Sequence, residues 1–165
     1  MSRLLAAAAV AVALAAAVPW IDNASRGSKP RDPRAPTPEP EGKGLVALTA
    51  DGAGHFTVRA GLGDGCVDLM VDTGATTVTL THEDARQLGL HPRPDDYSVP
   101  VATANGLARA AAVRLDELRV GTIRLRDVKA LVAPAGALSR SLLGMSFIGR
   151  LARFEMRGRR LILEG

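Results

Sequence analysis

Asp72 is the residue whose position most needs a chemical explanation. It follows the apolar residues 69–71 in the stretch LMVDTGATTVTL and precedes a second apolar run, so the pattern places a carboxyl group at the end of a buried strand. A buried charge costs free energy unless it is paired or neutralised. Asp72 is therefore either a structural group bonded by its neighbours or a functional acid able to move a proton.

The elements that would position Asp72 can be read from local patterns. Residues 55–60 alternate, residues 61–65 are glycine-rich and residues 66–71 return, which predicts a strand pair that ends at Asp72. Residues 77–80 predict a further short strand. The carboxyl group would thus lie in a loop between two strands.

A short helix and a hairpin are predicted next. Thr81 is typical of a helix N-cap, Asp84 three residues later would complete a capping box, and Gly89 would end the helix. Asn105-Gly106 between strand-like segments predicts a tight hairpin, because a type I′ turn needs positive φ at both central residues.

The C-terminal part continues in strands. Residues 115–133 suggest strands that turn at Gly121, and Leu142-Leu143-Gly144 precedes a single short helical stretch. Residues 154–163 predict a last strand pair around Gly158. Short aliphatic runs punctuated by 17 Gly and 10 Pro predict an all-β fold, and aromatic residues make up only 3% of the chain, so we expect its core to be aliphatic.

Two segments precede this domain. Residues 4–21 form an uninterrupted apolar run after Arg3, and as a helix they would span about 27 Å, close to the roughly 30 Å of a membrane core. Trp20 at the outer end favours an uncleaved signal anchor over 1–21, with a cleaved signal peptide as the alternative. Either predicts that the body of the protein is exported.

Residues 22–43 hold five of the ten prolines and mixed charge, which predicts a disordered Pro-rich linker. The folded domain is then expected over residues 44–165.

Charge and cysteine content narrow the function further. The net charge is +4, but Arg and Lys are scattered singly among acids, so we expect no nucleic-acid partner. Cys66 is the one cysteine, which excludes an internal disulfide and metal sites built on CxxC pairs. We expect Cys66 to be a small buried hydrophobe, and we expect no metal and no cofactor.

Four stretches resemble known catalytic or ligand-binding motifs, but each lacks a residue or an element that the motif requires. GMSFIG resembles a hydrolase elbow, but Gly149 comes one residue late and no suitable His accompanies it. HEDAR has Arg86 where a zinc-protease helix needs a second His, and GLGDGC leads into a strand instead of a helix. A phosphatase-type aspartyl nucleophile would need a polar residue at the position of Gly74.

The order of elements around Asp72-Thr73-Gly74 is more specific. An apolar strand and D-T-G-A-T come first, the hairpin at Asn105-Gly106 second, and Leu142-Leu143-Gly144 before a short helix third. This order resembles the catalytic loop, flap and apolar-apolar-Gly segment of retropepsin-like aspartic proteases. GHFTVRA, DARQLGL, TANG and LLGMSFIGRL extend the resemblance to the single-domain, membrane-anchored branch of bacteria, over about residues 55–163.

The resemblance implies a fold and a location. We expect a retropepsin-like closed β-barrel, one lobe per chain, with one or two short helices. We also expect the protein to sit at the bacterial inner membrane through residues 1–21, with the domain in the periplasm, or to be secreted to the periplasm if that segment is cleaved.

The resemblance also implies a reaction. Two carboxylates that share one proton can supply both the base and the acid for direct attack of water on a peptide bond. This chain has one D-T-G, so the pair would require a homodimer that brings two copies of Asp72 together. The supporting residues of the active-site loop would be Thr73 and Gly74. The residues that bind the protein or peptide substrate would be Ala75, Thr76, Ala104, Asn105 and Gly106.

Two alternatives stay open. The first is a catalytically inactive, anchored peptide-binding or dimerisation module of the same fold. The second is a generic exported β-barrel binding protein, which has no reason to form a dimer. Asp72, Thr73 and Gly74 are all present, which favours the enzyme.

Overall fold

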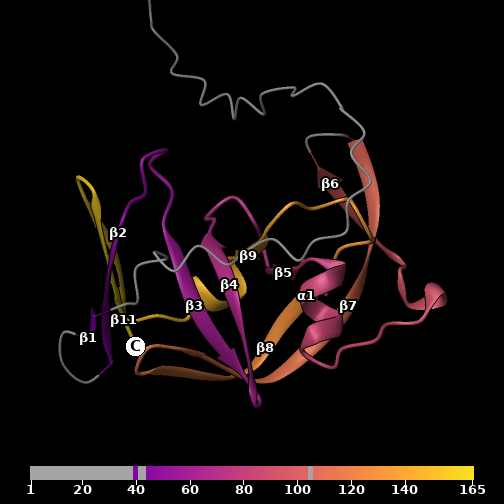
Figure 1. Ribbon diagram of the computed structural model, residues 1–165, viewed down its shortest axis with the longest axis horizontal. Coiled ribbons are helices and arrows are strands. Elements are labelled where there is room, and N and C mark those ends of the chain that lie inside the picture. The colour runs from indigo at the N-terminus through magenta and orange to yellow at the C-terminus, as the bar shows by residue number, and fades with distance from the viewer. Residues whose placement is uncertain (1–38, 41–43, 104–105) are drawn as a thin grey trace, which may run out of the picture. The chain divides into compact units, whose positions relative to one another are not determined.

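The computed structural model describes residues 39–40, 44–103 and 106–165 (Figure 1). The segment predicted over 1–21, nearly all of the predicted linker, and Ala104 and Asn105 lie outside these ranges. The strands are β1 (Glu39–Pro40), β2 (Leu45–Thr49), β3 (Thr57–Leu62), β4 (Gly65–Val71), β5 (Val78–Leu80), β6 (Val99–Thr103), β7 (Gly106–Val120), β8 (Ile123–Val132), β9 (Ser141–Leu143), β10 (Arg153–Arg157) and β11 (Arg160–Glu164). The helices are α1 (His82–Gln87), the 3-10 helix η1 (Pro94–Asp96) and α2 (Met145–Ile148).

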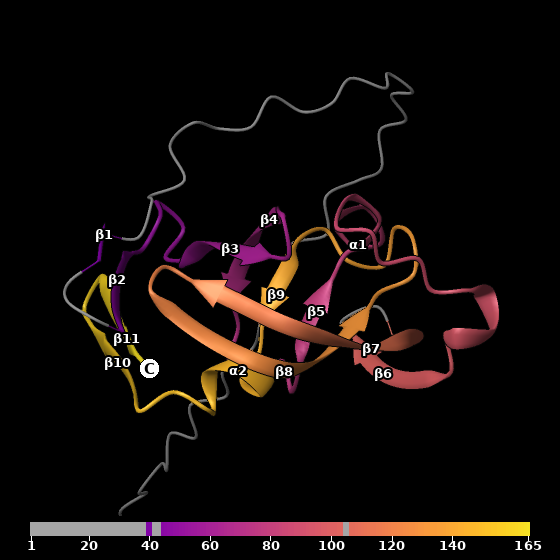
Figure 2. The same ribbon diagram turned by 90° about the horizontal axis from the view of Figure 1, so that it is seen from below.

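Six strands close into a barrel. The hydrogen-bonded order is β3-β4-β9-β5-β8-β7, and β7 returns to pair with β3, so the ring has no open edge. Figure 2 shows β7 and β8 as one long hairpin, and the far part of β7 also carries β6. A mostly β structure with a closed barrel and short helices confirms the predicted fold class.

The barrel closes through its shortest members. β9 has three residues and pairs in parallel with β4, where Leu69 lies opposite Ser141 and Val71 opposite Leu143. On its other side β9 meets β5, with Thr79 opposite Leu142. The two halves of the sheet are therefore joined by a strand of only three residues, which has a single pair with β5.

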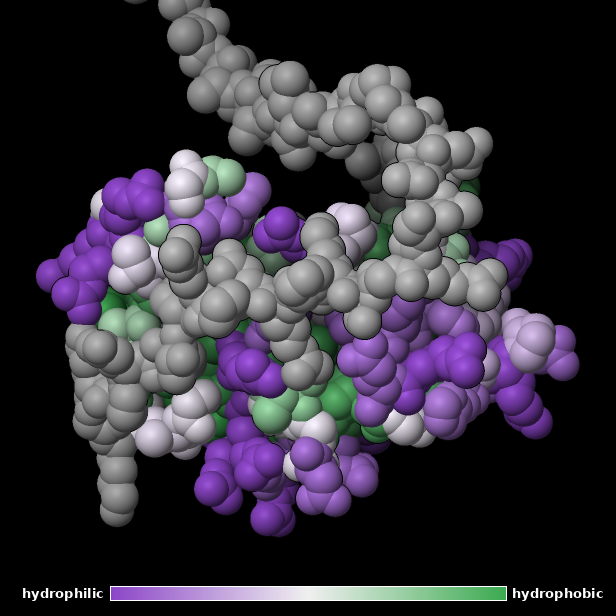
Figure 3. All heavy atoms as spheres, viewed as in Figure 1, coloured by the Kyte–Doolittle hydropathy of each residue, from purple (hydrophilic) through white to green (hydrophobic). Residues whose placement is uncertain are grey.

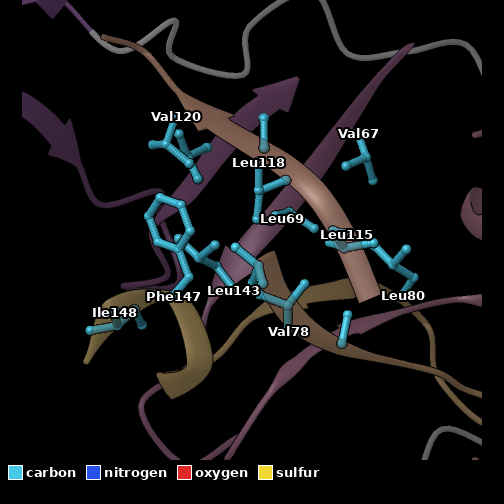
Figure 4. Close-up of a cluster of buried hydrophobic side chains, with 14 of the residues drawn as sticks. Val67, Leu69, Val78, Leu80, Leu115, Leu118, Val120, Leu143, Phe147 and Ile148 are labelled. Atoms are coloured by element: carbon cyan, nitrogen blue, oxygen red, sulfur yellow. The ribbon is translucent and has the colours of Figure 1, made fainter. Parts of the chain in front are cut away.

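The interior of the barrel is aliphatic, as the low aromatic content predicts. Leu69, Val78 and Leu143 are fully buried, and Phe147 of α2 is the largest of the fully buried side chains (Figure 4). Burying a side chain of this size contributes about 1.5–3 kcal/mol. The core therefore lies directly beneath the loop that follows β4.

The chain ends form a second sheet of order β1-β2-β11-β10 (Figure 1). β1 lies inside the predicted linker, because Glu39 pairs with Ala47 and Pro40 with Val46. Proline is tolerated here because an edge strand leaves one row of N–H groups without a ladder partner. Glu39 and Pro40, which lie within the predicted linker, therefore pair with the terminal sheet.

Two turns differ from the predictions by a residue or two. β3 runs to Leu62, and the turn before β4 is shorter than the predicted 61–65, with Gly63 at a φ of +54°. In the next hairpin Thr103 pairs with Gly106, so Gly106 is the first residue of β7 and not a central residue of the turn, as the predicted Asn105-Gly106 centre would have it. Pattern reading places a hairpin more reliably than it places the register of its turn.

The surface is strongly polar on the face shown in Figure 3, where hydrophilic side chains cover the lower and right-hand parts. Within the ranges that the structure describes, no helix is both long and apolar enough to cross a membrane. The apolar run of residues 4–21 lies outside those ranges.

Gly121 and Gly158 offer a matched test of turn packing. Both take a φ of +57°, but a Cβ on Gly121 would lie 2.7 Å from Cγ2 of Val46, whereas one on Gly158 would meet nothing within 4 Å. We expect Gly121→Ala to lower the free energy of unfolding by about 2–3 kcal/mol and Gly158→Ala by about 1 kcal/mol, measured by urea denaturation. Equal losses would show that contact with β2 does not constrain the β7–β8 turn.

Candidate active site

The loop after β4 is folded around the carboxylate of Asp72. The backbone N–H of Asp72 donates to the carbonyl of Leu143 at 3.1 Å. The Oδ1 atom of Asp72 accepts from the N–H of Gly74 at 2.8 Å. The backbone carbonyl of Asp72 accepts from the N–H of Ala75 at 3.3 Å. These bonds hold both the backbone and the side chain of Asp72 in one place.

The outer side of this loop is open in the single chain. Asp72 is half-buried, while Thr73, Gly74 and Thr76 are exposed. The hydroxyl of Thr73 makes no hydrogen bond to any residue that the structure describes. β4 ends at Val71, as the pattern of residues 66–71 predicts, and Asp72 follows it with its side chain half-buried instead of fully buried.

Gly144 lets the chain after β9 pass directly under the loop. A Cβ at this position would lie 2.1 Å from the carbonyl oxygen of Thr77 and 2.7 Å from that of Ala75. The next residue, Met145, donates its N–H to the carbonyl of Ala75 at 2.8 Å. The glycine of the predicted apolar-apolar-Gly segment is therefore required by space, because two stretches of backbone touch there.

Ser146 ties the start of α2 to strands on both sides. Its Oγ accepts from the N–H of Val78 at 2.9 Å and donates to the carbonyl of Lys129 at 2.7 Å. The far end of the Asp72 loop is thus anchored to α2 where β5 begins.

The hairpin of β6 and β7 stands apart from this loop in the chain. Gly106 begins β7 and is exposed, and Leu107 next to it is 85% exposed. Ala104 and Asn105 lie outside the described residues, so their substrate-binding roles stay predictions, as do those of Ala75, Thr76 and Gly106.

Asp51 and His82 are ionisable groups outside the Asp72 loop that bond residues close to them in the chain. The backbone N–H of His55, helped by that of Ala53, lowers the pKa of the Asp51 carboxyl. His82 bonds Tyr97 through Nδ1 at 3.2 Å. In the described part of the chain, no group of three His, Cys, Asp or Glu side chains is arranged to hold a metal ion.

Cys66 is exposed, which corrects the expectation that it is buried. The alternation of β4 explains the difference, because Val67 and Leu69 are buried while the alternate residues Cys66 and Asp68 are exposed on the opposite face.

Sequence reasoning missed the partners that support the loop. The carbonyl of Leu143 carries no signal in the sequence, because any residue supplies a carbonyl. Ser141 and Asp84, which contact each other at 2.5 Å, are 57 residues apart in the chain. Only the capping pattern at Thr81 drew attention to Asp84.

Comparison with known families and structures gives a consistent result. Residues 58–150 match the family model described as gag-polyprotein putative aspartyl protease. The fold is similar to the crystal structure of a retropepsin-like aspartic protease from Rickettsia conorii, with a TM-score of 0.66 and 34% sequence identity. That similarity covers 73% of this chain and 89% of the other.

Two curated relatives are uncharacterized proteins. One, from Sinorhizobium sp, is 44% identical over 117 residues, or 71% of this chain. The other, from Rickettsia prowazekii (strain Madrid E), is 37% identical over 121 residues, or 73% of this chain. The match spans about half the length of each relative, 50% and 52%.

Gly144→Ala tests the close approach beneath the loop. The added methyl group would collide with two carbonyl oxygens, so we expect a loss of about 3 kcal/mol or more in the free energy of unfolding, measured by urea denaturation. Gly52→Ala is the control, because a Cβ there meets nothing within 4 Å. A Gly144→Ala protein as stable as the Gly52→Ala protein would contradict the proposed packing.

Proposed function

Since the chain belongs to the retropepsin-like aspartic proteases, we propose that it is an endopeptidase that hydrolyses peptide bonds as a homodimer. The observation that carries the proposal is the Asp72 loop. It holds one carboxylate by its own backbone and leaves the outer side of that carboxylate free for a partner. The chain has one D-T-G, so the second carboxylate would be the partner's Asp72.

The proposed reaction uses the two carboxylates with one proton between them. Like charges about 3 Å apart cannot both stay ionised, so one group is a base and the other an acid. The ionised group takes a proton from a bound water, whose oxygen attacks the carbonyl carbon of the peptide. The protonated group gives its proton to the leaving nitrogen, and the C–N bond breaks. Both groups then return to the shared-proton state.

An open apolar strip on the terminal sheet supports the homodimer. Two rows of apolar side chains cross this sheet from β2 through β11 to β10. Exposure along them rises abruptly at β10: Val46 0%, Leu163 0% and Phe154 37% in one row, and Leu48 1%, Leu161 1% and Met156 65% in the other. The apolar layer of the core therefore continues onto β10, the last strand of the sheet, where no described part of the chain covers it.

The β10 strand is also complementary to itself. An antiparallel pairing that sets Phe154 opposite the partner's Phe154 sets Arg153 opposite the partner's Glu155, and the reverse. β10 pairs only with β11 among the described strands, so its other edge is available for such a ladder. We propose that a second copy covers this edge.

Asp72→Asn tests the proposed acid–base role. The amide cannot carry the shared proton, so we expect peptide cleavage to fall by at least about 10²–10⁴-fold while the dimer persists. The measurement is cleavage of a mixed peptide library by the full chain, read by mass spectrometry, with sedimentation velocity for the dimer. Asp68→Asn is the control, because Asp68 is exposed on β4, the strand that leads to Asp72. Cleavage by the Asp72→Asn dimer would refute the mechanism, and a well-folded wild-type dimer without cleavage would favour the inactive binding module.

Cleavage of the same peptide library, measured over a range of pH, tests the shared proton. One proton on the pair is required, so we expect kcat to fall on both sides of an optimum and the optimum to lie on the acid side of neutrality. A rate that is flat from pH 4 to 8 would contradict a shared proton.

Met156→Lys tests the proposed interface. A lysine in the apolar strip would bury an unpaired charge, so we expect the Kd of the dimer to rise by about tenfold or more, measured by analytical ultracentrifugation. Gln87→Lys adds the same charge on the exposed surface of α1 and should leave the Kd unchanged. Equal Kd values for the two variants would place the interface elsewhere.

A further inference from the structure

We propose that Ser141 and Asp84 are positioning residues for the proposed reaction. They would act on Asp72 through β9, and this inference rests on the function proposed above. Neither residue is part of the D-T-G loop or of the hairpin, and neither contacts Asp72 in the structure. Their effect would pass through the carbonyl of Leu143, which receives the N–H of Asp72.

Ser141 lies inside the capping box that the sequence predicts at α1. The Oγ of Thr81 accepts from the N–H of Asp84 at 3.0 Å, as a helix N-cap should. The return bond of a capping box is missing, because the N–H of Thr81 donates at 2.9 Å to the Oγ of Ser141. That hydroxyl in turn donates to Oδ2 of Asp84 at 2.5 Å. The hydroxyl of Ser141 thus relays the interaction that Asp84 would otherwise make directly.

This relay fixes the first residue of β9. Ser141 is 1% exposed, so its hydroxyl has no water to replace a lost partner. The preceding residues 133–140 form no helix or strand, so Ser141 is the point at which the returning chain becomes held. Oδ2 of Asp84 offers an acceptor there, and the N–H of Thr81 offers a donor.

The other end of β9 holds the candidate site. Leu143 is two residues from Ser141, about 7 Å along an extended strand. Its carbonyl accepts from Asp72, and Gly144 passes directly under the loop. A shift of β9 along β4 would therefore move the backbone on which Asp72 rests. Misplacement of a reacting group by about 1 Å can cost about 10²-fold in rate.

A positioning role differs from a purely structural one in what it changes. Loss of the relay would leave the substrate-binding surface in place but loosen the carboxylate, so kcat should fall while KM stays nearly constant. A general loss of folded protein would instead lower the active fraction and the melting temperature without a local change at Asp72. The two roles can be separated by kinetics together with local hydrogen exchange.

The test compares Ser141→Ala, Asp84→Ala and Asp84→Asn in the full 165-residue chain. We expect kcat to fall by about tenfold in the two alanine variants, with KM within about twofold of wild type. The asparagine keeps an oxygen acceptor for the hydroxyl of Ser141, so Asp84→Asn should recover most of kcat. The kcat of the double variant Ser141→Ala/Asp84→Ala should be no lower than that of Ser141→Ala, because both residues act through one relay.

Amide hydrogen exchange by NMR supplies a readout that does not require activity. We expect the N–H of Asp72 to exchange about tenfold faster in Ser141→Ala than in wild type. The N–H of Ala50, which donates to the carbonyl of Arg159 at 2.9 Å in the terminal sheet, should keep its protection. If the two amides lose protection equally, the relay stabilises the whole fold and does not position the loop.

The outcomes separate this proposal from the proposed function. Wild-type protein that does not cleave would refute the proposed activity, and the exchange of Asp72 would still decide whether Ser141 holds the loop. Wild-type cleavage with unchanged kcat and unchanged Asp72 exchange in Ser141→Ala would overturn the positioning role alone. Asp84→Asn as impaired as Asp84→Ala would overturn the assignment of Asp84 as the acceptor that matters.

Discussion

The hydrogen bond from the N–H of Asp72 to the carbonyl of Leu143 joins the two parts of the chain on which the candidate site depends. It lies where β4 ends and β9 ends, and these parallel strands bring residues 72 apart in sequence into register. The barrel closes through the same junction, because β9 lies between β4 and β5. The junction of β4 and β9 therefore both places the carboxylate of Asp72 and closes the barrel. A change at that junction would alter both.

The space under the loop follows from this junction. Once β9 lies against β4, the chain after it must cross beneath residues 75–77, and only glycine fits at position 144. Ser146 and Met145 then bond the start of α2 to the two ends of that crossing. The side chain of Phe147, which follows them in α2, is fully buried in the core (Figure 4). A rigid scaffold below and an exposed loop above are the arrangement that a preorganised site requires.

The single chain has two surfaces that are incomplete in related ways. In the homodimer that we propose, the Asp72 loop would present one of two paired carboxylates, and the β10 edge presents an apolar strip that the described part of the chain leaves uncovered. The homodimer that we propose would explain both features in the same way, because each chain would supply what the other lacks. Membership in the retropepsin-like family fits this reading, since one lobe per chain leaves the second carboxylate to another copy.

The sequence by itself determined the features that depend on near neighbours: the strand pair before Asp72, the N-cap at Thr81, the turn glycines at 121 and 158, and the D-T-G motif. Each is decided by φ, by spacing or by bonds within a few residues. Only the tertiary structure decided that Ser141 enters the cap of α1, that Glu39 and Pro40 join the terminal sheet, that Cys66 faces outward, and that Phe154 and Met156 lie uncovered. These outcomes depend on which distant strands become neighbours, and packing between segments far apart in the chain leaves no local pattern to read.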